Sequence, residues 1–122
     1  MKQLFSLVVL SSTLLISCGD AADAPKQAAV DITQDPVYKK GFALVKESDC
    51  LTCHQVDAKA IGPSYREIAQ KYEGIGSDQI TAVAQKIITG GSGVWGQIPM
   101  TPHPSLSTED ATAMLQYILL LK

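Results

Sequence analysis

Two cysteines and a histidine lie within five residues, in the segment CLTCH at positions 50–54. Two thiols and an imidazole at this spacing suit a zinc site, a dithiol redox pair, a structural disulfide or a covalently attached haem. Zinc usually takes four ligands, but the only further cysteine and histidine are Cys18, outside the folded region, and His103. A redox pair is expected beside a βαβ pattern, which the sequence lacks. A disulfide between Cys50 and Cys53 would close too small a loop to stabilise much.

The pattern C-x-x-C-H is the signature of covalent haem attachment, which accounts for all three side chains. Each thiol adds across a vinyl group of the haem, and two intervening residues in a turn of helix span the two attachment points. His54 comes next in the chain and reaches the iron from one face. We therefore predict one covalently bound haem c, attached through Cys50 and Cys53, with His54 as an iron ligand.

The second axial position on the iron has three candidate ligands, Met100, Met114 and His103. Met114 falls on the apolar stripe of a predicted helix, where packing is its default role. Met100 follows Pro99 in a loop with a second proline at position 102, and prolines restrict the freedom of such a loop. We predict that His54 and Met100 are the metal ligands. Ligation by His54 and His103 is the alternative.

Size and charge limit the class of protein. The 122 residues suit one small domain. Lys and Arg total 10 and Asp and Glu total 12, so the formal net charge is −2. Proteins that bind nucleic acids normally carry a basic patch or an excess of positive charge. No nucleic-acid partner is therefore predicted.

Helical periodicity and capping residues predict about four helices in residues 35–122, over 35–48, 64–72, 77–89 and 107–121. Asp35-Pro36, Ser77 and Ser107 supply the starts of the first, third and last helices. The glycine- and proline-rich segment from residue 91 to residue 105 is predicted to be a long loop. No alternating segment indicates a strand, so the predicted fold class is all-α.

The N-terminal residues fit an exported lipoprotein. Lys2 precedes a mainly apolar run over residues 4–16, as in a secretory signal peptide. The run ends in LISC at positions 15–18, which resembles a bacterial lipobox. We expect a signal peptide at residues 1–17, a lipid on Cys18, a flexible tether at 18–34 and the domain at 35–122. A soluble secreted protein with a free Cys18 is the alternative.

Residues 35–122 resemble a class I cytochrome c, most closely the small bacterial c551/c552-type cytochromes. Three motifs in order carry the resemblance: CLTCH, IGPSYREIAQKY and GGSGVWGQIPMTPHP. It implies a small all-α class I cytochrome c fold around one covalently bound haem. The first and last helices should cross, with Gly41 and Phe42 near Tyr117.

The resemblance also implies roles for three further residues around the haem. The Pro63 carbonyl should accept a hydrogen bond from His54, and Trp95 should lie near a haem propionate. The chain departs from the family at His103, where asparagine is frequent. A neutral histidine at this position could donate a hydrogen bond to the methionine sulfur, as asparagine can.

These features predict a membrane-anchored electron carrier, not an enzyme, whose iron cycles between Fe(III) and Fe(II). It would act as a monomer on the periplasmic side, with the redox partner proteins of a respiratory chain. An apolar ring around the haem edge, at Cys50, Cys53, Ile61, Val94 and Ile98, is the expected docking patch. The rival predictions are a peroxidase-like or gas-binding haem protein with an open sixth position and a haem-free lipoprotein with a disulfide.

Overall fold

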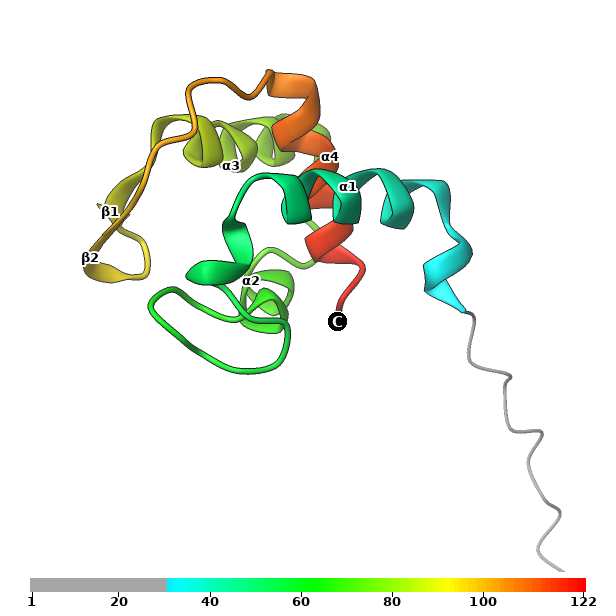
Figure 1. Cartoon of the computed structure of the whole chain (residues 1–122), viewed down its shortest axis with the longest axis horizontal. Helices are drawn as coiled ribbons and strands as arrows, with labels where there is room; N and C mark the ends of the chain where they lie inside the picture. Colours follow the sequence, from blue (N-terminus) through cyan, green and yellow to red (C-terminus); the bar gives the residue numbers. More distant parts are fainter. Residues whose placement is uncertain (1–30) are drawn as a thin grey trace, which may run out of the picture.

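The computed structural model of the protein describes residues 31–122, which form four α-helices, two 3₁₀ turns and one short hairpin (Figure 1). The predicted signal peptide, the predicted lipidation site Cys18 and residues 18–30 of the predicted tether lie outside the described residues. In residues 31–122 no helix combines the length and the apolar character needed to cross a bilayer.

A 3₁₀ turn, η1 (Ile32–Gln34), precedes the first α-helix. The Asp31 carboxylate caps it by accepting a hydrogen bond from the Thr33 backbone N–H at 3.0 Å. Ile32 is half-buried and packs against the main core. Ile32, which the predicted tether includes, therefore buries apolar surface against the domain.

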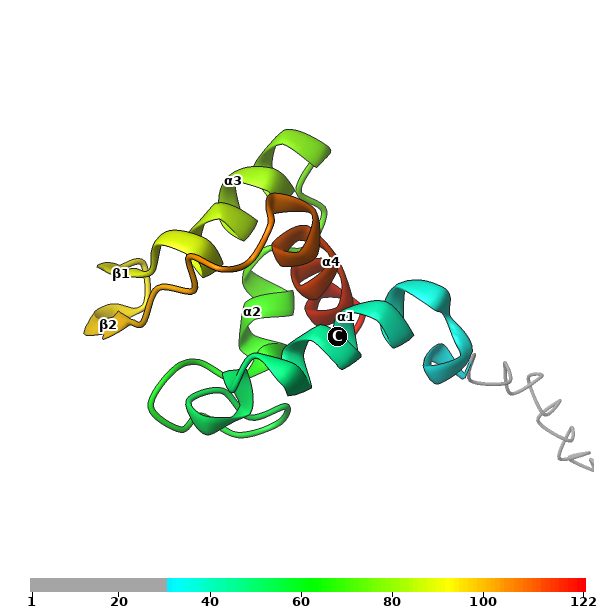
Figure 2. The ribbon, with the colours of Figure 1, turned by 45° about the horizontal axis from the view of Figure 1, so that its top comes forward.

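Helix α1 (Pro36–Glu47) crosses helix α4 (Thr108–Leu119) at close range (Figure 2). Gly41 permits the close approach, because a Cβ at this position would overlap the Tyr117 side chain and the Ala113 carbonyl. The Phe42 and Tyr117 ring centroids lie 5.7 Å apart. The expected crossing, with Gly41 and Phe42 near Tyr117, is confirmed.

The predicted starts of these two helices are also confirmed. The Asp35 carboxylate accepts a hydrogen bond from the Val37 N–H at 2.7 Å, and Pro36 is the first residue of α1. The Ser107 hydroxyl accepts one from the Asp110 N–H at 3.0 Å at the start of α4. Each cap satisfies a backbone donor that has no partner inside its helix.

Helices α2 (Tyr65–Lys71) and α3 (Ser77–Thr89) also pack against α4, which contacts all three other α-helices. The prediction that Ser77 caps α3 is wrong. Gly76 is the N-cap, with extended backbone and its N–H donating to the Gln79 side chain at 3.2 Å. Ser77 is instead the first helical residue.

A hairpin of β1 (Gly91–Gly93) and β2 (Gly96–Met100) follows α3. Its strands are antiparallel, with Gly91 opposite Met100 and Gly93 opposite Gly96. The prediction of a strand-free loop is therefore wrong here. Glycine has a low strand propensity, so the repeated glycines gave no strand signal in the sequence. They allow the positive φ of 111° at Gly93 and 112° at Gly96, on either side of the turn.

The core lies where α4 meets α1 and α2. Its main buried residues are Val45, Tyr65, Met114, Tyr117, Ile118 and Leu121. A second, smaller cluster under α3 consists of Ala84, Ala111 and Leu115. Met114 is 1% exposed, which confirms the prediction that it has a packing role.

Candidate functional site

The two cysteines and the histidine lie on one tight turn directly after α1. Asp49 makes the turn from α1 with a positive φ of 56°, an uncommon conformation that aspartate tolerates better than most residues. The 3₁₀ turn η2 (Cys50–Thr52) follows. The N–H groups of Cys53 and His54 both donate to the Cys50 carbonyl, at 3.2 and 3.0 Å. The local backbone therefore brings both thiols and the imidazole together.

The imidazole of His54 is fixed by contacts on three sides. Its Nδ1 lies 2.7 Å from the Pro63 carbonyl oxygen, the contact that the resemblance implies. As the acceptor is a carbonyl, Nδ1 must carry the proton, which leaves Nε2 free to bind a metal. The Tyr65 ring stacks on the imidazole at 5.9 Å, with 16° between the planes. A Cβ at Gly62 would collide with the imidazole, so only glycine fits there.

The segment after His54 is held by backbone hydrogen bonds to the start of α2. The Gly62 N–H donates to the Cys53 carbonyl at 2.9 Å, and the Tyr65 N–H donates to the Gln55 carbonyl at 2.9 Å. The Arg66 N–H donates to the Val56 carbonyl at 3.2 Å. These bonds close the loop that carries both the imidazole and its Pro63 acceptor.

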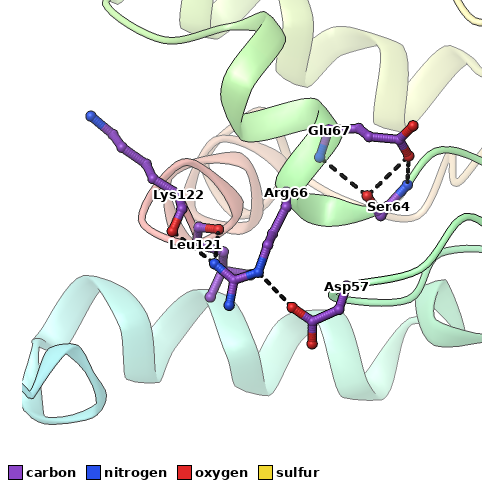
Figure 3. Close-up of polar contacts among 6 residues, drawn as sticks. All are labelled: Asp57, Ser64, Arg66, Glu67, Leu121 and Lys122. Atoms are coloured by element: carbon purple, nitrogen blue, oxygen red, sulfur yellow. Dashed lines mark hydrogen bonds and ion pairs between the residues drawn. The ribbon is translucent and has the colours of Figure 1, made fainter.

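The Arg66 guanidinium joins three separate segments (Figure 3). Its Nε donates to the Asp57 carboxylate at 2.5 Å, within the loop after His54. Its Nη1 donates to the backbone oxygens of Leu121 and Lys122, at 2.8 and 2.7 Å. The loop is thereby tied to the residues that follow α4, whose backbone oxygens have no helical partners.

A reciprocal cap sets the start of α2 beside the site (Figure 3). The Ser64 hydroxyl accepts from the Glu67 N–H at 3.2 Å, and the Glu67 carboxylate accepts from the Ser64 N–H at 2.7 Å. Hydrogen bonds from Ser64, first from its N–H and then from its hydroxyl, lower the pKa of the Glu67 carboxyl. The cap holds the residue that follows Pro63, and so helps to place the carbonyl that orients His54.

Met100 lies at the end of β2 and is held mainly through its backbone. Gly90, with a positive φ of 65°, lets the backbone of residues 100–102 approach so closely that a Cβ would overlap the Met100 carbonyl oxygen. Farther along, the His103 N–H donates to the carbonyls of Ile88 at 3.0 Å and Ile87 at 3.3 Å. The chain around Met100 is therefore fastened to the end of α3.

One cavity of about 600 Å³ brings all these groups together. A volume of this size is typical of a pocket for a small molecule or cofactor. Its walls come from the end of α1, η2, α2, the end of α3, the hairpin and α4. Its lining includes Cys50, Cys53, His54, Tyr65, Ile68, Trp95, Met100, His103, Met114 and Ile118.

The residues present fit a large flat apolar group that carries a metal and a polar edge. Both thiols are free, and the free imidazole nitrogen and the thioether of Met100 offer metal donors in the same cavity. Lys59 and Lys86 also line it and could pair with carboxylates. In residues 31–122 no group of three or more His, Cys, Asp or Glu side chains is gathered for a metal ion, so the zinc alternative has no support there.

Two buried polar atoms in residues 31–122 have no hydrogen-bond partner among protein atoms, the Tyr65 Oη and the His103 Nδ1. Both residues line the cavity. Native proteins leave few buried polar groups unpaired, so the two atoms are consistent with a site that a bound group completes. Burial also raises the pKa of the Cys50 thiol, with smaller contributions from Asp49 and Cys53, and so favours its protonated form.

The structure places each predicted haem-site residue of the domain around this one cavity, including Pro63 and Trp95. Trp95 is 41% exposed and is held by the Lys71 ammonium over its ring at 5.2 Å and by an edge contact with Tyr72 at 6.5 Å. Sequence reasoning missed Gly62, Tyr65 and Arg66 as positioning residues. The segment GPSY at positions 62–65 could have indicated Gly62 and Tyr65, whereas no local pattern indicates Arg66.

The sequence matches the Cytochrome c family over residues 38–122. Cytochrome c-552 of Nitrosomonas europaea is 48% identical over 79 residues, which cover 65% of this chain and 76% of the relative. Cytochrome c-551 of Allochromatium vinosum is 38% identical over 88 residues, which cover 72% of this chain and 93% of the relative. The crystal structure of wild-type N. europaea cytochrome c552 matches with a TM-score of 0.61 at 47% identity, covering 66% of this chain and 99% of that one.

Proposed function

We propose, because this chain belongs to the cytochrome c family, that it is a membrane-anchored electron carrier whose iron is held by His54 and Met100. The chain is a monohaem c-type cytochrome that carries electrons, and its cofactor is one covalently attached haem c. It adopts the class I cytochrome c fold. The proposal adds the residues that bind the haem, the route to the membrane and the surface that meets redox partners.

The proposed ligand set rests on one observation: the cavity contains both the His54 imidazole, whose Nε2 is free to bind a metal, and the Met100 thioether. Cys50 and Cys53 would form the thioether bonds, and His54 would bind iron through Nε2. When bound, the haem supplies a reversible Fe(III)/Fe(II) couple. Hydrogen bonding to the Pro63 carbonyl fixes the ring and raises the basicity of the ligand nitrogen. The Met100 sulfur favours the ferrous state.

The same cavity disfavours the rival enzyme function. A haem with two strong protein ligands mainly moves electrons, whereas an open position binds peroxide or gases. Met100 occupies the wall that would have to be open, and no acid–base pair is visible in the hairpin that carries it. The carrier function therefore requires only that this chain hold both ligands, exclude water and leave one haem edge near the surface.

An apolar rim is the proposed docking surface for a redox partner. Ile61, Val94 and Ile98 line the cavity yet are 56%, 55% and 68% exposed. Cys50 and Cys53 are only half-buried and face the cavity, so they would contribute less to the patch than expected. Exposed apolar patches of this kind mark protein contact sites, and a carrier that releases its partner needs only a small one.

The ligand set is tested by visible spectroscopy of the exported protein in both redox states. We expect a six-coordinate low-spin haem, with the weak red band of a thioether bonded to ferric iron. The band should disappear in Met100→Ala and persist in His103→Ala. A band that survives in Met100→Ala would reject Met100 as the ligand.

The membrane anchor is proposed from LISC at positions 15–18, which resembles a lipobox. The domain would be exported, tethered through lipidated Cys18 and free to reach partners near the membrane surface. Cys18→Ser should release the protein from the membrane fraction, or leave the signal peptide uncleaved, with the haem spectrum unchanged. Membrane association that survives both Cys18→Ser and deletion of residues 1–34 would reject the anchor.

A further inference from the structure

A continuous row of aromatic rings leads from the proposed axial ligand towards the surface. The Tyr65 ring stacks on His54 with centroids 5.9 Å apart. Tyr65 meets the edge of Tyr117 at 6.2 Å, and Tyr117 meets Tyr38 at 5.0 Å. Phe42 packs beside the last two rings, at 5.7 Å from Tyr117 and 5.8 Å from Tyr38.

The row passes through the core and ends at the surface. Tyr65 and Tyr117 are each 1% exposed, whereas Tyr38 is half-buried. Tyr38 lies in the first turn of α1, and the start of this helix is on the side of the molecule away from the hairpin (Figure 1). The row therefore connects the haem cavity to a different surface from the apolar rim that would meet redox partners.

The ordinary carrier cycle does not require this row. A phenol is a far poorer electron donor than a ferrous haem, so tyrosines stay reduced while the iron exchanges electrons with a partner. A strong two-electron oxidant such as hydrogen peroxide changes this, since the iron can supply only one electron on going from ferrous to ferric. The second electron must come from elsewhere in the protein.

We propose that Tyr65, Tyr117 and Tyr38 form a relay that carries this second oxidising equivalent away from the haem to Tyr38. Hydrogen peroxide takes up two electrons and two protons as its O–O bond breaks, and two water molecules form. Bound ferrous haem would give one electron, Tyr38 would give the other with its phenolic proton, and solvent would give the second proton. The products are ferric protein and a neutral tyrosyl radical at Tyr38.

Burial determines where the radical rests. A tyrosine that loses an electron must also lose its proton, and Tyr65 and Tyr117 are too deeply buried, at 1% exposure each, to pass one to solvent. Burial also raises the pKa of Tyr117 to about 12, with a smaller contribution from Tyr38. Tyr38 is the member of the row that reaches the surface, where water accepts the proton. Tyr65 and Tyr117 therefore bridge the electron transfer without holding the radical, and Tyr38 is the final source of the electron.

Trp95 is the strongest competitor, because it lines the cavity and indole is easily oxidised. The Lys71 ammonium lies over its ring at 5.2 Å. Oxidation of tryptophan first gives a radical cation, and the nearby positive charge disfavours that species. Lys46 lies over Phe42 in the tyrosine row at 5.6 Å, but a tyrosyl radical is neutral and does not meet the same repulsion.

The relay rests on the proposed function, because it needs a haem bound by His54. The test uses the ferrous holoprotein, whose haem content and six-coordinate spectrum are recorded before peroxide is added. A missing haem or an altered spectrum at this stage would reject the ligand assignment itself. If the spectrum is normal, a negative result after peroxide is added rejects the relay and not the ligand assignment.

Two measurements locate the radical after one equivalent of hydrogen peroxide has been added to the ferrous protein. Freeze-quenched samples are examined by electron paramagnetic resonance, and a nitroso spin trap followed by peptide mass spectrometry identifies the labelled residue in the wild-type protein. We expect a tyrosyl signal and a trap adduct on Tyr38. The double variant Tyr38→Phe/Tyr117→Phe should lose most of the tyrosyl signal. Its haem should also bleach faster in excess peroxide.

Tyr72→Phe is the matched control, since Tyr72 also lines the cavity but lies outside the row. It should keep the tyrosyl signal and the trap adduct on Tyr38. Wild-type adducts on Trp95 or Tyr72 in place of Tyr38 would overturn the relay. An undiminished tyrosyl signal in the folded double variant would overturn it as well, and the adduct map remains decisive if that variant fails to fold.

Discussion

The two walls of the cavity are built in different ways. On the His54 wall, the side chain itself is held by the Pro63 carbonyl at 2.7 Å and by stacking on Tyr65 at 5.9 Å. On the Met100 wall, the contacts involve the backbone: Gly90 against the Met100 carbonyl, and the His103 N–H on Ile88. The strand that carries Met100 is exposed over its first four residues.

The difference indicates which ligand is easier to lose. The imidazole is oriented before a metal arrives, so its binding needs little further ordering. The thioether depends on a glycine-rich hairpin whose side chains are mostly exposed, and such segments open locally at low cost. We therefore expect the His54 wall to form the permanent part of the site and the Met100 wall to be the part at which coordination opens.

Removing the ligand from each wall should give the largest contrast. His54→Ala should abolish the low-spin spectrum, because the covalent link through Cys50 and Cys53 cannot replace the axial imidazole. Met100→Ala should keep covalent haem but open one position, so that carbon monoxide binds. Absorption spectra of the two variants, recorded with and without carbon monoxide, measure the loss of the low-spin state and the opening of the coordination position. Haem that extracts into acid–acetone from the wild-type protein would contradict covalent attachment.

Exchanging the donor on the Met100 wall should change the reduction potential. Met100→His should keep a six-coordinate haem and lower the potential, because imidazole favours ferrous iron less than a thioether does. Potentiometric titration measures the shift. His103→Ala serves as the control and should change the potential only modestly, because it leaves both proposed ligands in place. A larger shift in His103→Ala than in Met100→His would favour the bis-histidine alternative.

Adding one carbon beside the imidazole should disturb the His54 wall. Gly62→Ala places a Cβ in the space of the His54 ring, and overpacking of this kind typically costs about 1–3 kcal/mol. Denaturant unfolding of the holoprotein measures the loss, and the spectrum should report a shifted ligand. Gly76→Ser, where no atom lies within 4 Å of a new Cβ, is the control. Equal stability of the two variants would contradict the tight fit at Gly62.

Alkaline pH should destabilise the core that supports this wall. The pKa of Tyr117 is raised to about 12, mainly by burial. Its neutral form therefore contributes stability in full below the ordinary tyrosine pKa of about 10, and this contribution is lost as the pH rises towards 12. Unfolding curves at pH 8 to 12 measure the loss, which should be smaller in Tyr117→Phe. An identical pH dependence in Tyr117→Phe would contradict this origin.

The smallest expected effect concerns the arginine that ties the His54 loop to α4. Arg66→Ala removes hydrogen bonds to Asp57 and to two backbone oxygens, and we expect a loss of about 1 kcal/mol because the pair is exposed to solvent. Chemical denaturation provides the value. Lys40→Ala breaks an exposed pair with Glu109 between α1 and α4 and should cost less. A larger loss in Lys40→Ala would contradict the role assigned to Arg66.

Much of the chemistry was determined by the sequence alone. CLTCH selects covalent haem attachment because few other sites use two thiols and an imidazole at this spacing. Met100 is the proposed second ligand because the domain contains only two other candidate donors. Asp35 and Ser107 identify helix starts since capping acts over three residues. All of these signals are local in the chain.

The rest was decided by the tertiary structure, because it depends on residues that meet only after folding. Arg66 reaches the end of α4 across more than fifty residues, and no local pattern indicates such a contact. The hairpin escaped sequence reasoning because its strands contain three glycines and a proline, residues that are depleted in strands. The row from His54 to Tyr38 joins α1, α2 and α4. Only the packing of these helices determines that the rings touch in that order.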